Sequence, residues 1–460
     1  MDKKEILISI IIPVYNVESY VSDCLNSVLK QINDQIEVII IDDGSSDRSK
    51  DICEDIVNSV QANVKICTQN NKGLSVTRNR GIDVSNGKYV MFLDADDELD
   101  SQTIVTLLQS IKEYPEVDLF YYDAKIVDEI CDGKRKSIYD RKNKVPALNI
   151  MDSWEYFNEY YVDTLIVSAC LCLIKKKIID NNEIRFDVGR LYEDNVFSLN
   201  VLLNSKKVCY LPYDLYIRRY RENSITTSYI LKKNIQDGCF IIKRFLKFND
   251  WILMNNSETT CNTYLNLIYK MYSWIKNMMA EVNFFCGSTN QIAEEIIDIL
   301  NGWPERFKSF SYYLVLYLIV KENSNLCIDI ELIHKKINEC YLVVLNKISE
   351  VSSKRVALYG RGKHTEYLLK KYKELLGREL DFTVYVDTYQ SEGFGDDGKR
   401  IVNIADVQNF AEIIIISSYE YRLEMKKKCY ECNSSIEIID LYDVEKMNMF
   451  DERLTIRNSQ

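Results

Sequence analysis

Short apolar runs and amphipathic segments alternate along the first part of the chain. The runs have the length and the Ile/Val content of buried strands, and the segments between them space their apolar residues as helices do. The predicted strands are Ile6–Ile12, Glu37–Ile41, Val64–Cys67 and Tyr89–Leu93, and the predicted helices are Val17–Lys30, Asp47–Val60 and Leu74–Val84. This alternation predicts an α/β fold with a parallel sheet covered by helices on both faces.

The pattern changes further along the chain. Residues 101–230 continue with mixed patterns, which include the strand candidates Leu119–Asp123 and Lys207–Leu211. Long aromatic-rich segments with helical periodicity and few strand signals then extend from Leu231 to Glu350. We therefore predict a region of several helices after the first α/β domain.

Alternating strands and helices return near the C-terminus. The expected elements are the strand Val356–Tyr359, the turn Gly360–Lys363, the helix His364–Leu376 and the strands Phe382–Val386, Glu412–Ser417 and Ile436–Ile439. This order is typical of a small Rossmann-like α/β domain. The chain is thus predicted to have three regions: a first domain over residues 1–230, a helical region over 231–350, and a Rossmann-like domain over 351–460.

Composition and charge narrow the classes of function. Hydrophobic residues make up 47% of the 460 residues and charged residues 28%, as in globular proteins. The net charge of −11 argues against a nucleic-acid binder, because phosphate neutralisation requires a basic surface. The apolar run before Pro13 lacks the cleavage pattern of a signal peptide, and Tyr312–Val320 is too short to cross a bilayer.

The 14 cysteines do not have the spacing of a disulfide framework. Cys429 and Cys432 form a CxxC pair without a second pair, which is weak support for a zinc or redox site. Reduced thiols in a cytoplasmic protein are the better interpretation.

Three carboxylates follow the apolar run that ends at Leu93. Asp94, Asp96 and Asp97 lie within four positions, so their charges would repel one another at neutral pH. A divalent cation on a nucleotide diphosphate relieves this repulsion, because carboxylate oxygens are hard ligands that suit Mg²⁺ or Mn²⁺. The alternative is a solvated turn in which an aspartate caps the next helix.

Two other strand exits and one helix start carry residues suited to a nucleotide. Asp43 is suited to accept a hydrogen bond from a pyrimidine imide, and Tyr15, after Pro13, is suited to stack on a base. Lys72 and Arg78 lie on either side of a glycine at a helix start, where backbone N–H groups and positive charge favour an anion. Turns, helix caps and surface basic residues are the plainer explanations.

Two further charged groups lie beyond residue 190. Glu193 and Asp194 open a predicted helix, where they either complement the helix dipole or supply a general base for a sugar hydroxyl. Arg218, Arg219 and Arg221 either bind a diphosphate or form a solvated face. Each feature alone leaves both interpretations open.

The order and spacing of these motifs resemble the family 2 glycosyltransferases, which have the GT-A fold. The motifs are P-x-Y-N, DDGSSD, N-x-G-x-S-x-x-R-N-x-G, FLDADD and Tyr-Glu-Asp, and they cover about residues 5–230. The similarity is strongest to bacterial members that build capsule, exopolysaccharide and other surface glycans. The resemblance implies a GT-A catalytic domain over residues 1–230, with a mostly parallel sheet flanked by helices.

The resemblance also implies a role for each matched position. The nucleobase and ribose would be held by Pro13, Tyr15, Asp43 and Arg78. Asp94 would contact the ribose or the ion, and Asp96 the metal. Asp194 would be the catalytic base, with Glu193 beside it.

Enzymes of this family move a sugar, with inversion at the anomeric carbon, from a nucleotide-sugar donor that is most often UDP-linked. The resemblance therefore implies Mn²⁺ or Mg²⁺ on the diphosphate. Many relatives add a metal-binding histidine near the arginines, whereas the histidines here are His334 and His364. Either water completes the metal shell, or Arg218, Arg219 and Arg221 carry more of the diphosphate charge.

The acceptor and the other binding partners are less closely defined than the donor. The expected acceptor is a glycan, a lipid-linked saccharide or a glycoprotein, used at the cytosolic side of surface-glycan assembly. A peripheral membrane contact and a homo-oligomer through the helical or C-terminal region are both open. In the C-terminal domain, Gly360 and Gly362 with Asp387 suggest a dinucleotide site, but Thr365 replaces the third glycine of the fingerprint, so a structural or docking module is preferred.

Two other functions fit the sequence less well than sugar transfer does. A non-catalytic sugar-nucleotide-binding scaffold or sensor of a glycan assembly complex would be expected to lose its acids, yet Asp94, Asp96 and Asp194 are all present. A nucleotidyltransferase would have a Gly-rich phosphate loop after the first strand, where this chain has the sequence PVYN.

Overall fold

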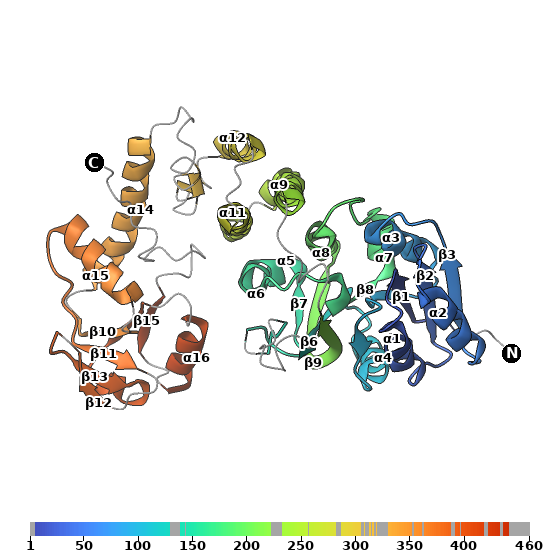
Figure 1. Cartoon of the computed structure of the whole chain (residues 1–460). Coiled ribbons are helices and arrows are strands. Elements are labelled where there is room, and N and C mark those ends of the chain that lie inside the picture. The colour runs from blue at the N-terminus through green and yellow to red at the C-terminus, as the bar shows by residue number, and fades with distance from the viewer. Residues whose placement is uncertain are drawn as a thin grey trace. The chain divides into compact units, whose positions relative to one another are not determined.

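The computed structural model describes most of the chain. The described residues are 5–128, 139–142, 144–221, 232–255, 257–281, 287–304, 308, 312–313, 315–316, 319, 330–351, 354–360, 363–387, 392–395, 397–417, 422–432 and 436–440. They divide into two compact units (Figure 1). Unit 1 comprises Met1–Lys247 and Ser273–Phe285, and unit 2 comprises Phe248–Tyr272 and Cys286–Gln460. Across these residues, no helix is long and apolar enough to cross a membrane.

Parallel strands form the first half of the sheet in unit 1. They follow the spatial order β3-β2-β1-β4, and each is parallel to its neighbour. Their bounds are β1 Ile8–Val14, β2 Ile36–Asp42, β3 Val64–Thr68 and β4 Tyr89–Phe92. Every residue of β1 and β2 is buried, because both faces of this part of the sheet are covered, and this explains their nearly continuous apolar runs. The predicted α/β arrangement is confirmed here.

Three helices connect these strands. Their bounds are α1 Val21–Leu29, α2 Ser49–Asn58 and α3 Leu74–Val84. In Figure 1, α3 lies above the strands and α1 below them. Helix α3 packs closely on β1 at Gly81, where an added Cβ would lie 2.3 Å from Ile11 Cγ2, so this contact requires a glycine.

Antiparallel pairs complete the sheet, and the sequence pattern did not predict them. Strand β8 (Cys172–Lys175) lies between β4 and β6 (Leu119–Asp128) and is antiparallel to both. Strand β9 (Lys207–Tyr220) is parallel to β6 but antiparallel to β5 (Glu98–Leu99) and β7 (Ile150–Asp152). The sheet is therefore mixed, with its parallel half at the N-terminal end.

The remaining helices of unit 1 follow β4 along the chain. They are α4 Thr103–Glu113, α5 Ser153–Tyr156, the π-helix η1 Phe157–Tyr161, α6 Val162–Thr164, the 3-10 helix η2 Ala169–Leu171, α7 Lys176–Asn181, α8 Glu193–Asn204 and α9 Lys232–Leu246. Helix α11 (Glu258–Glu281) contributes residues to both units.

The predicted helical region is confirmed in character. It contains α9, α10 Asn249–Met254, α11, α12 Gly287–Asn301 and α14 Ile330–Glu350. Of the apolar run 312–320, the described residues Tyr312, Tyr313, Val315, Leu316 and Ile319 are helical, and the others lie outside the described residues.

A smaller sheet forms the C-terminal part of unit 2. Its strands follow the order β12-β13-β11-β10-β14-β15, and all pairs are parallel except β12 with β13. The elements are β10 Val356–Tyr359, α15 Lys363–Leu376, β11 Val384–Asp387, β12 Glu392–Phe394, β13 Arg400–Asn403, η4 Ile404–Asn409, β14 Ile413–Ile416, α16 Arg422–Cys432 and β15 Glu437–Asp440. This is the predicted Rossmann-like domain.

The glycine motif of this domain is only partly visible. Gly360 has φ +111° at the end of β10, whereas Arg361 and Gly362 lie outside the described residues. Thr365 is buried, and its hydroxyl lies 2.7 Å from Ser417 Oγ at the end of β14. A hydroxyl pair thus stands where the dinucleotide fingerprint has its third glycine, which is consistent with a structural role for this turn.

Candidate functional site

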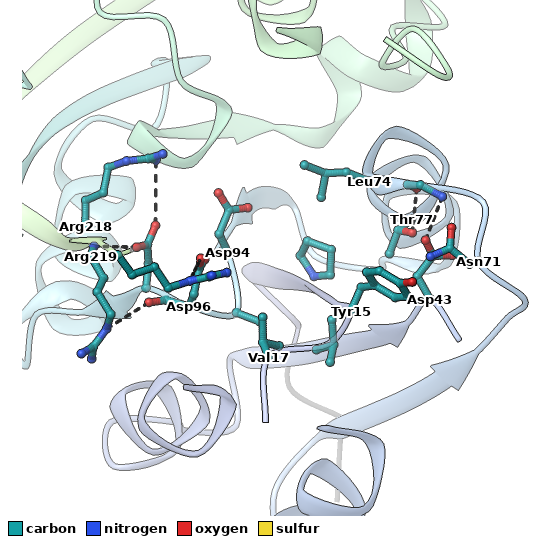
Figure 2. Close-up of a pocket in the computed structure, with 16 residues that line it drawn as sticks. Tyr15, Val17, Asp43, Asn71, Leu74, Thr77, Asp94, Asp96, Arg218 and Arg219 are labelled. Atoms are coloured by element: carbon teal, nitrogen blue, oxygen red, sulfur yellow. Dashed lines mark hydrogen bonds and ion pairs between the residues drawn. The ribbon is translucent and has the colours of Figure 1, made fainter. Parts of the chain in front are cut away.

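A cavity of about 430 Å³ opens at the carboxyl ends of strands β1, β2 and β4 (Figure 2). Ligands of open α/β sheets bind beyond this edge of the strands. The cavity is lined by Pro13, Val14, Tyr15, Val17, Asp43, Asn71, Gly73, Leu74, Thr77, Asp94, Ala95, Asp96, Asp97, Arg218, Arg219 and Arg221. Most of the predicted site residues are therefore brought together. The exceptions are Lys72, Arg78, Glu193 and Asp194, which are not among its lining residues.

One end of the cavity combines an exposed aromatic ring with a buried carboxylate. Tyr15 is 49% exposed, so its ring is accessible to a ligand. Asp43 is buried, and its carboxylate accepts hydrogen bonds from the backbone N–H groups of Lys72 at 2.9 Å and Gly73 at 2.8 Å. It also accepts one from Gln69 Nε2 at 2.8 Å. The first effect of Asp43 is therefore to hold the loop that precedes α3.

The loop that carries Tyr15 is fixed to the start of α2. Asn16 has φ +51°, and its Oδ1 accepts from the Ser46 backbone N–H at 2.8 Å. Asp47 accepts from the backbone N–H groups of Glu18 and Ser49, each at 3.0 Å. Asp47 thus connects the first residue of α2 with the loop that follows Tyr15.

The opposite end of the cavity holds the acidic turn after β4. Each of its carboxylates has a partner from a distant part of the chain. Asp94 Oδ1 accepts from Arg78 Nη2 at 2.7 Å, and Asp96 Oδ2 accepts from Arg221 Nε at 2.9 Å. Asp97 is 3% exposed and accepts from the Arg219 backbone N–H at 2.7 Å. The mutual repulsion that the sequence implied is thus offset by arginines.

Burial dominates the ionisation of Asp97. Burial, together with the charges of Asp96 and Asp94, raises the pKa of Asp97 to about 7, although Arg218 opposes this. Burial also disfavours the charged form of Asp94, but the guanidinium groups of Arg78 and Arg218 outweigh it and lower the pKa of that carboxyl. Neighbouring carboxylates in one turn therefore differ in charge state near neutral pH.

Strand pairing explains why the arginines lie beside the acidic turn. Strand β5 follows that turn directly and pairs with β9, where Glu98 is opposite Ile217. The next residues of β9 are Arg218 and Arg219, and strand alternation sends their side chains in different directions. Arg219 and Arg221 lie over the Tyr20 ring, at 5.4 and 5.0 Å from its centroid. Arg218 Nη1 lies 3.9 Å from Asp97 Oδ2 instead.

Arg78 connects the acidic turn to the start of α8. Its side chain is 2% exposed, and its Nη1 donates to Glu193 Oε1 at 2.7 Å while Nη2 contacts Asp94. Burial and the adjacent Asp194 carboxylate raise the pKa of Glu193 to about 7, against the effect of Arg78. Asp194 Oδ2 accepts from the Ala169 backbone N–H at 3.3 Å. Arg78 therefore links Glu193, one of the two acids of the predicted base, to Asp94, which lines the cavity.

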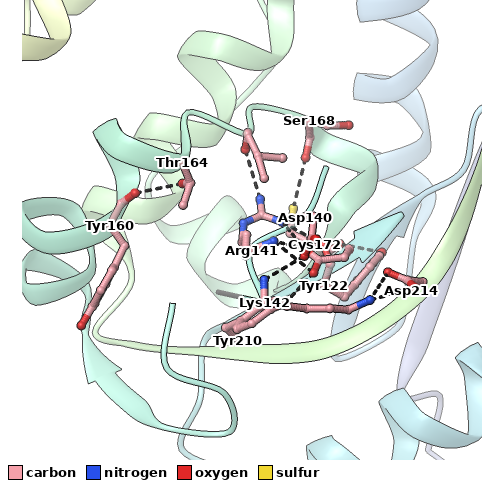
Figure 3. A network of polar contacts seen from close by, with 12 residues as sticks. Tyr122, Asp140, Arg141, Lys142, Tyr160, Thr164, Ser168, Cys172, Tyr210 and Asp214 are labelled. Carbon is pink, nitrogen blue, oxygen red and sulfur yellow. Dashed lines mark hydrogen bonds and ion pairs between the residues drawn. The ribbon is translucent and has the colours of Figure 1, made fainter. Parts of the chain in front are cut away.

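A buried polar network centres on Arg141 (Figure 3). Arg141 is 1% exposed, contacts the Asp123 carboxylate at 3.3 Å, and donates from Nη2 to the Ile166 carbonyl at 3.1 Å. The segment after Ile166 leads to η2, whose Ala169 donates to Asp194. Sequence reasoning missed this network, because nothing local marks either Arg141 or Asp123 as buried.

Sequence reasoning also missed other residues that line the cavity or contact its lining residues. Asn71, Leu74 and Thr77 line it and lie inside a motif that was recognised for other residues. Tyr216 donates from its hydroxyl to Asp97 Oδ2 at 2.7 Å, and Tyr20 lies beneath two arginines. No pattern in the sequence distinguishes these two tyrosines from the many others.

The residues at the acidic end fit a divalent cation that is shared with a diphosphate. Asp94 and Asp96 line the cavity, their side chains are each 23% exposed, and they offer hard oxygen ligands. Among the described residues, no cluster of three or more His, Cys, Asp and Glu side chains forms a metal site by itself. Mg²⁺ commonly binds through one or two carboxylates plus substrate phosphates, so two aspartates are a sufficient protein contribution.

Comparison with known proteins agrees with this arrangement. The sequence model of glycosyl transferase family 2 matches residues 9–181. Over 228 residues the chain is 32% identical to glycosyltransferase GlyA of Streptococcus pneumoniae, covering 48% of this chain and 31% of GlyA. It is 31% identical to the uncharacterized glycosyltransferase EpsJ of Bacillus subtilis, covering 48% of this chain and 63% of EpsJ. The matched region thus spans less than two thirds of either relative.

A further relative and a solved structure complete the comparison. Glycosyltransferase GlyG of S. pneumoniae is 30% identical over 233 residues, which cover 48% of this chain and 72% of GlyG. The crystal structure of S. aureus TarS 1–349 in complex with UDP-GlcNAc superposes with a TM-score of 0.54 at 21% identity, covering 69% of this chain and 89% of TarS 1–349. The shared fold is GT-A. The family match and the similarity to GlyG over most of its length show that this chain belongs to glycosyl transferase family 2.

Proposed function

We propose that the chain is an inverting glycosyltransferase that moves a sugar from a nucleotide-sugar donor, a UDP-sugar, to a hydroxyl group of a glycan, lipid-linked saccharide or glycoprotein. The observation that carries the proposal is the composition of one cavity. An exposed aromatic ring lies at one end, and three carboxylates and three arginines lie at the other. A nucleoside diphosphate has the matching shape and charge. The TarS complex with UDP-GlcNAc supports a UDP donor.

The donor would lie along the cavity with its base at Tyr15. The ring can stack on a pyrimidine, beside Pro13 and Asp43, while Arg218 and Arg219 face the diphosphate. Lys72 is exposed and its side chain is not among those that line the cavity, so a phosphate contact by this residue remains a prediction.

Arg78 would act through its partners. Its buried guanidinium contacts Asp94 and Glu193, which favours an indirect effect on the ribose and on the base over direct contact with the nucleobase. The ion pair with Asp94 keeps that carboxylate charged and oriented toward the cavity.

Asp96, with Asp94, would hold Mn²⁺ or Mg²⁺. When bound, the ion neutralises charge on the diphosphate oxygens of the leaving group. Arg221 already contacts Asp96, and with Arg218 and Arg219 it supplies positive charge where the diphosphate leaves. This arrangement would compensate for the histidine that many relatives place here.

Asp194 would act as the general base. It would take the proton of the acceptor hydroxyl while that oxygen attacks the anomeric carbon from the face opposite the donor phosphate. The bond between the anomeric carbon and the phosphate oxygen breaks, and its electron pair leaves with the nucleoside diphosphate. The result is inversion at the anomeric carbon. Glu193, paired with Arg78, would hold the start of α8 in place.

The cellular context of the reaction is also part of the proposal. EpsJ, GlyA and GlyG are named as glycosyltransferases, and we propose work at the cytosolic side of surface-glycan assembly. We also keep the division into a catalytic domain over 1–230, a helical region over 231–350 and an accessory domain over 351–460 as a proposal, with acceptor docking or self-association as the role of the last two.

A donor panel tests the proposal. Sugar nucleotides are assayed for hydrolysis and transfer with Mn²⁺, Mg²⁺ or a chelator, using the full chain and the variants Asp96→Ala and Asp194→Asn. Asp180→Asn, at an exposed ion pair with Lys176, is the matched control. We expect turnover by the wild type and by the control, and losses of about 100-fold or more in the two variants.

Two results would contradict the proposal in different ways. Donor binding without turnover for every acceptor tried would favour the non-catalytic scaffold or sensor. Full activity of both Asp96→Ala and Asp194→Asn with the true acceptor would remove the catalytic assignment of these residues.

A further inference from the structure

One side chain of α3 holds the segment that leads into α8. Asn79 Nδ2 donates to the Phe186 carbonyl at 2.9 Å, and Asn79 Oδ1 accepts from the Phe186 backbone N–H at 2.9 Å. The amide thereby satisfies the donor and the acceptor of a single residue that is 107 positions away in sequence. Two hydrogen bonds to one backbone unit fix its orientation as well as its position.

The ring of Phe186 packs against both the strand that leads to Asp94 and the helix that begins with Glu193. It stacks on Phe197 with centroids 3.8 Å apart and an interplanar angle of 8°, and it meets Phe92 edge-on at 5.3 Å. All three rings are 2% exposed or less. Phe92 ends the strand that leads to Asp94, and Phe197 lies in the first turns of the helix that begins with Glu193. The Phe186 ring therefore fills the space between the end of β4, which precedes the acidic turn, and α8.

Arg78, the residue before Asn79, contacts the same Phe186 ring. Its guanidinium lies over the Phe186 ring, 5.3 Å from the centroid, while it pairs with Asp94 and Glu193. Successive residues of α3 thus hold the site in two ways: Arg78 by charge and Asn79 by the backbone of Phe186. Neither Asn79 nor Phe186 is among the residues that line the donor cavity.

We infer that Asn79 is a positioning residue for the transfer step, and that it sets the place of Asp194 relative to the donor site through Phe186 and Phe197. The inference rests on the proposed function. A general base must lie within hydrogen-bond reach of the acceptor hydroxyl, so a small shift of α8 slows proton removal. Leu74 and Thr77 of α3 line the donor cavity, but Asn79 does not, and its contact with Phe186 leads to α8, so donor binding should change far less than proton removal.

A comparison of donor binding with turnover tests the inference. The full-length variants Asn79→Ala, which loses both hydrogen bonds, and Asn79→Asp, which keeps only the acceptor, are compared with the wild type. UDP affinity is measured by calorimetry, donor KM and kcat by transfer assay, and thermal stability by the unfolding midpoint. Asn182→Ala is the control, because exposed Asn182 also donates to a backbone carbonyl, in α7.

We expect kcat to fall about 10- to 100-fold in Asn79→Ala and less in Asn79→Asp, in line with the cost of a misplaced catalytic group. UDP affinity and donor KM should stay within about twofold of the wild type. Phe197→Leu, which leaves the amide contacts intact but removes the ring stack, should show the same division and provides the test if Asn79→Ala does not fold.

Each result that contradicts the inference would have a different meaning. Equal losses in UDP affinity and kcat would mean a general structural role for Asn79, and an unchanged kcat would mean no role in the transfer step. Either result, with an active wild type, overturns this inference alone. A wild type that neither binds UDP nor turns over any donor overturns the proposed function and this inference with it.

Discussion

Arg78 Nη1 lies 2.7 Å from Glu193 Oε1, although 115 positions separate the two residues in sequence. The second terminal nitrogen of the same guanidinium contacts Asp94, so one buried cation joins the acidic turn to the helix of the proposed base. The two carboxylates differ in ionisation, because burial and Asp194 raise the pKa of Glu193 to about 7 while Arg78 and Arg218 keep that of Asp94 low.

Arg78→Lys should keep only one of the two ion pairs that Arg78 makes with Asp94 and Glu193. An ammonium group offers no planar fork to hold two carboxylates at once, so one of the two pairs is lost in a buried place. We expect kcat/KM to fall about 100-fold and the unfolding midpoint to drop by several degrees. Arg80→Lys, at a half-buried arginine of the same helix whose Nη1 donates to the Thr68 carbonyl at 2.9 Å, is the control for the substitution itself. Wild-type kinetics in Arg78→Lys would show that the bridge has no catalytic importance.

Asp97→Asn should change how stability depends on pH. The pKa of Asp97 is about 7 in the folded chain and ordinarily 3.8, so between these values the folded protein keeps a proton that the unfolded chain has released. The contribution of Asp97 to the free energy of unfolding is therefore greatest at low pH and is lost as pH rises toward 7.

The measurement compares unfolding midpoints of the wild type and Asp97→Asn at pH 5 and pH 8. Relative to the wild type, the variant should gain about 2 kcal/mol between these pH values. Asp180→Asn, at an exposed position, should show no such gain. A difference between Asp97→Asn and wild type that is constant with pH would argue that Asp97 titrates normally.

Arg221→Ala should increase the affinity of the free protein for Mn²⁺. Arg221 Nε lies 2.9 Å from Asp96 Oδ2, so the arginine and a cation compete for the same carboxylate. Titration of Mn²⁺ followed by electron paramagnetic resonance should show affinity that rises several-fold in the variant, while UDP affinity without metal falls because a phosphate-facing cation is gone. Mn²⁺ affinity that stays the same or decreases would contradict competition at Asp96.

Gly44→Ala should destabilise the loop that Asp43 holds. Gly44 has φ +73°, and an added Cβ would lie 2.9 Å from Asn71 N, a backbone atom that cannot rotate away. Gly189→Ala is a matched control, because Gly189 also has φ +73° but nothing within 4 Å of the added Cβ. We expect about 1 kcal/mol of destabilisation in the control and clearly more in Gly44→Ala, measured by thermal unfolding. Equal effects would show that the contact with Asn71 relaxes freely.

Tyr15 should bind the base by its ring and not by its hydroxyl. The ring is 49% exposed at the rim of the cavity, and stacking of a base on an aromatic ring contributes about 1–3 kcal/mol. Calorimetry with UDP should therefore give a dissociation constant about 10- to 100-fold higher for Tyr15→Ala and nearly unchanged for Tyr15→Phe. The reverse order would assign the binding energy to the phenolic hydroxyl.

The local elements of this chain follow from its sequence. Helix α3 has the predicted bounds Leu74–Val84, and β1 lies within two residues of its predicted position, because a buried strand and an amphipathic helix each have a pattern that a short window contains. The acidic turn, the Glu193-Asp194 pair and the arginine cluster were also visible as groups, since each lies within a few consecutive residues. That the acidic turn and the arginines share one cavity was expected only from the order of the motifs, and Glu193 and Asp194 are not among the residues that line it.

Sheet order and burial were decided by the tertiary structure. Strand β9 runs past its predicted end at Leu211 because its second half pairs with β5 and β6, and only that pairing brings Arg218 to Asp97. The contact of Asn79 with Phe186 likewise depends on where the chain returns after β8. Contacts between residues a hundred or more positions apart, and the pKa values that burial imposes, depend on the packed arrangement of whole elements. No local pattern contains that information, whereas the strands, turns and motifs themselves are local.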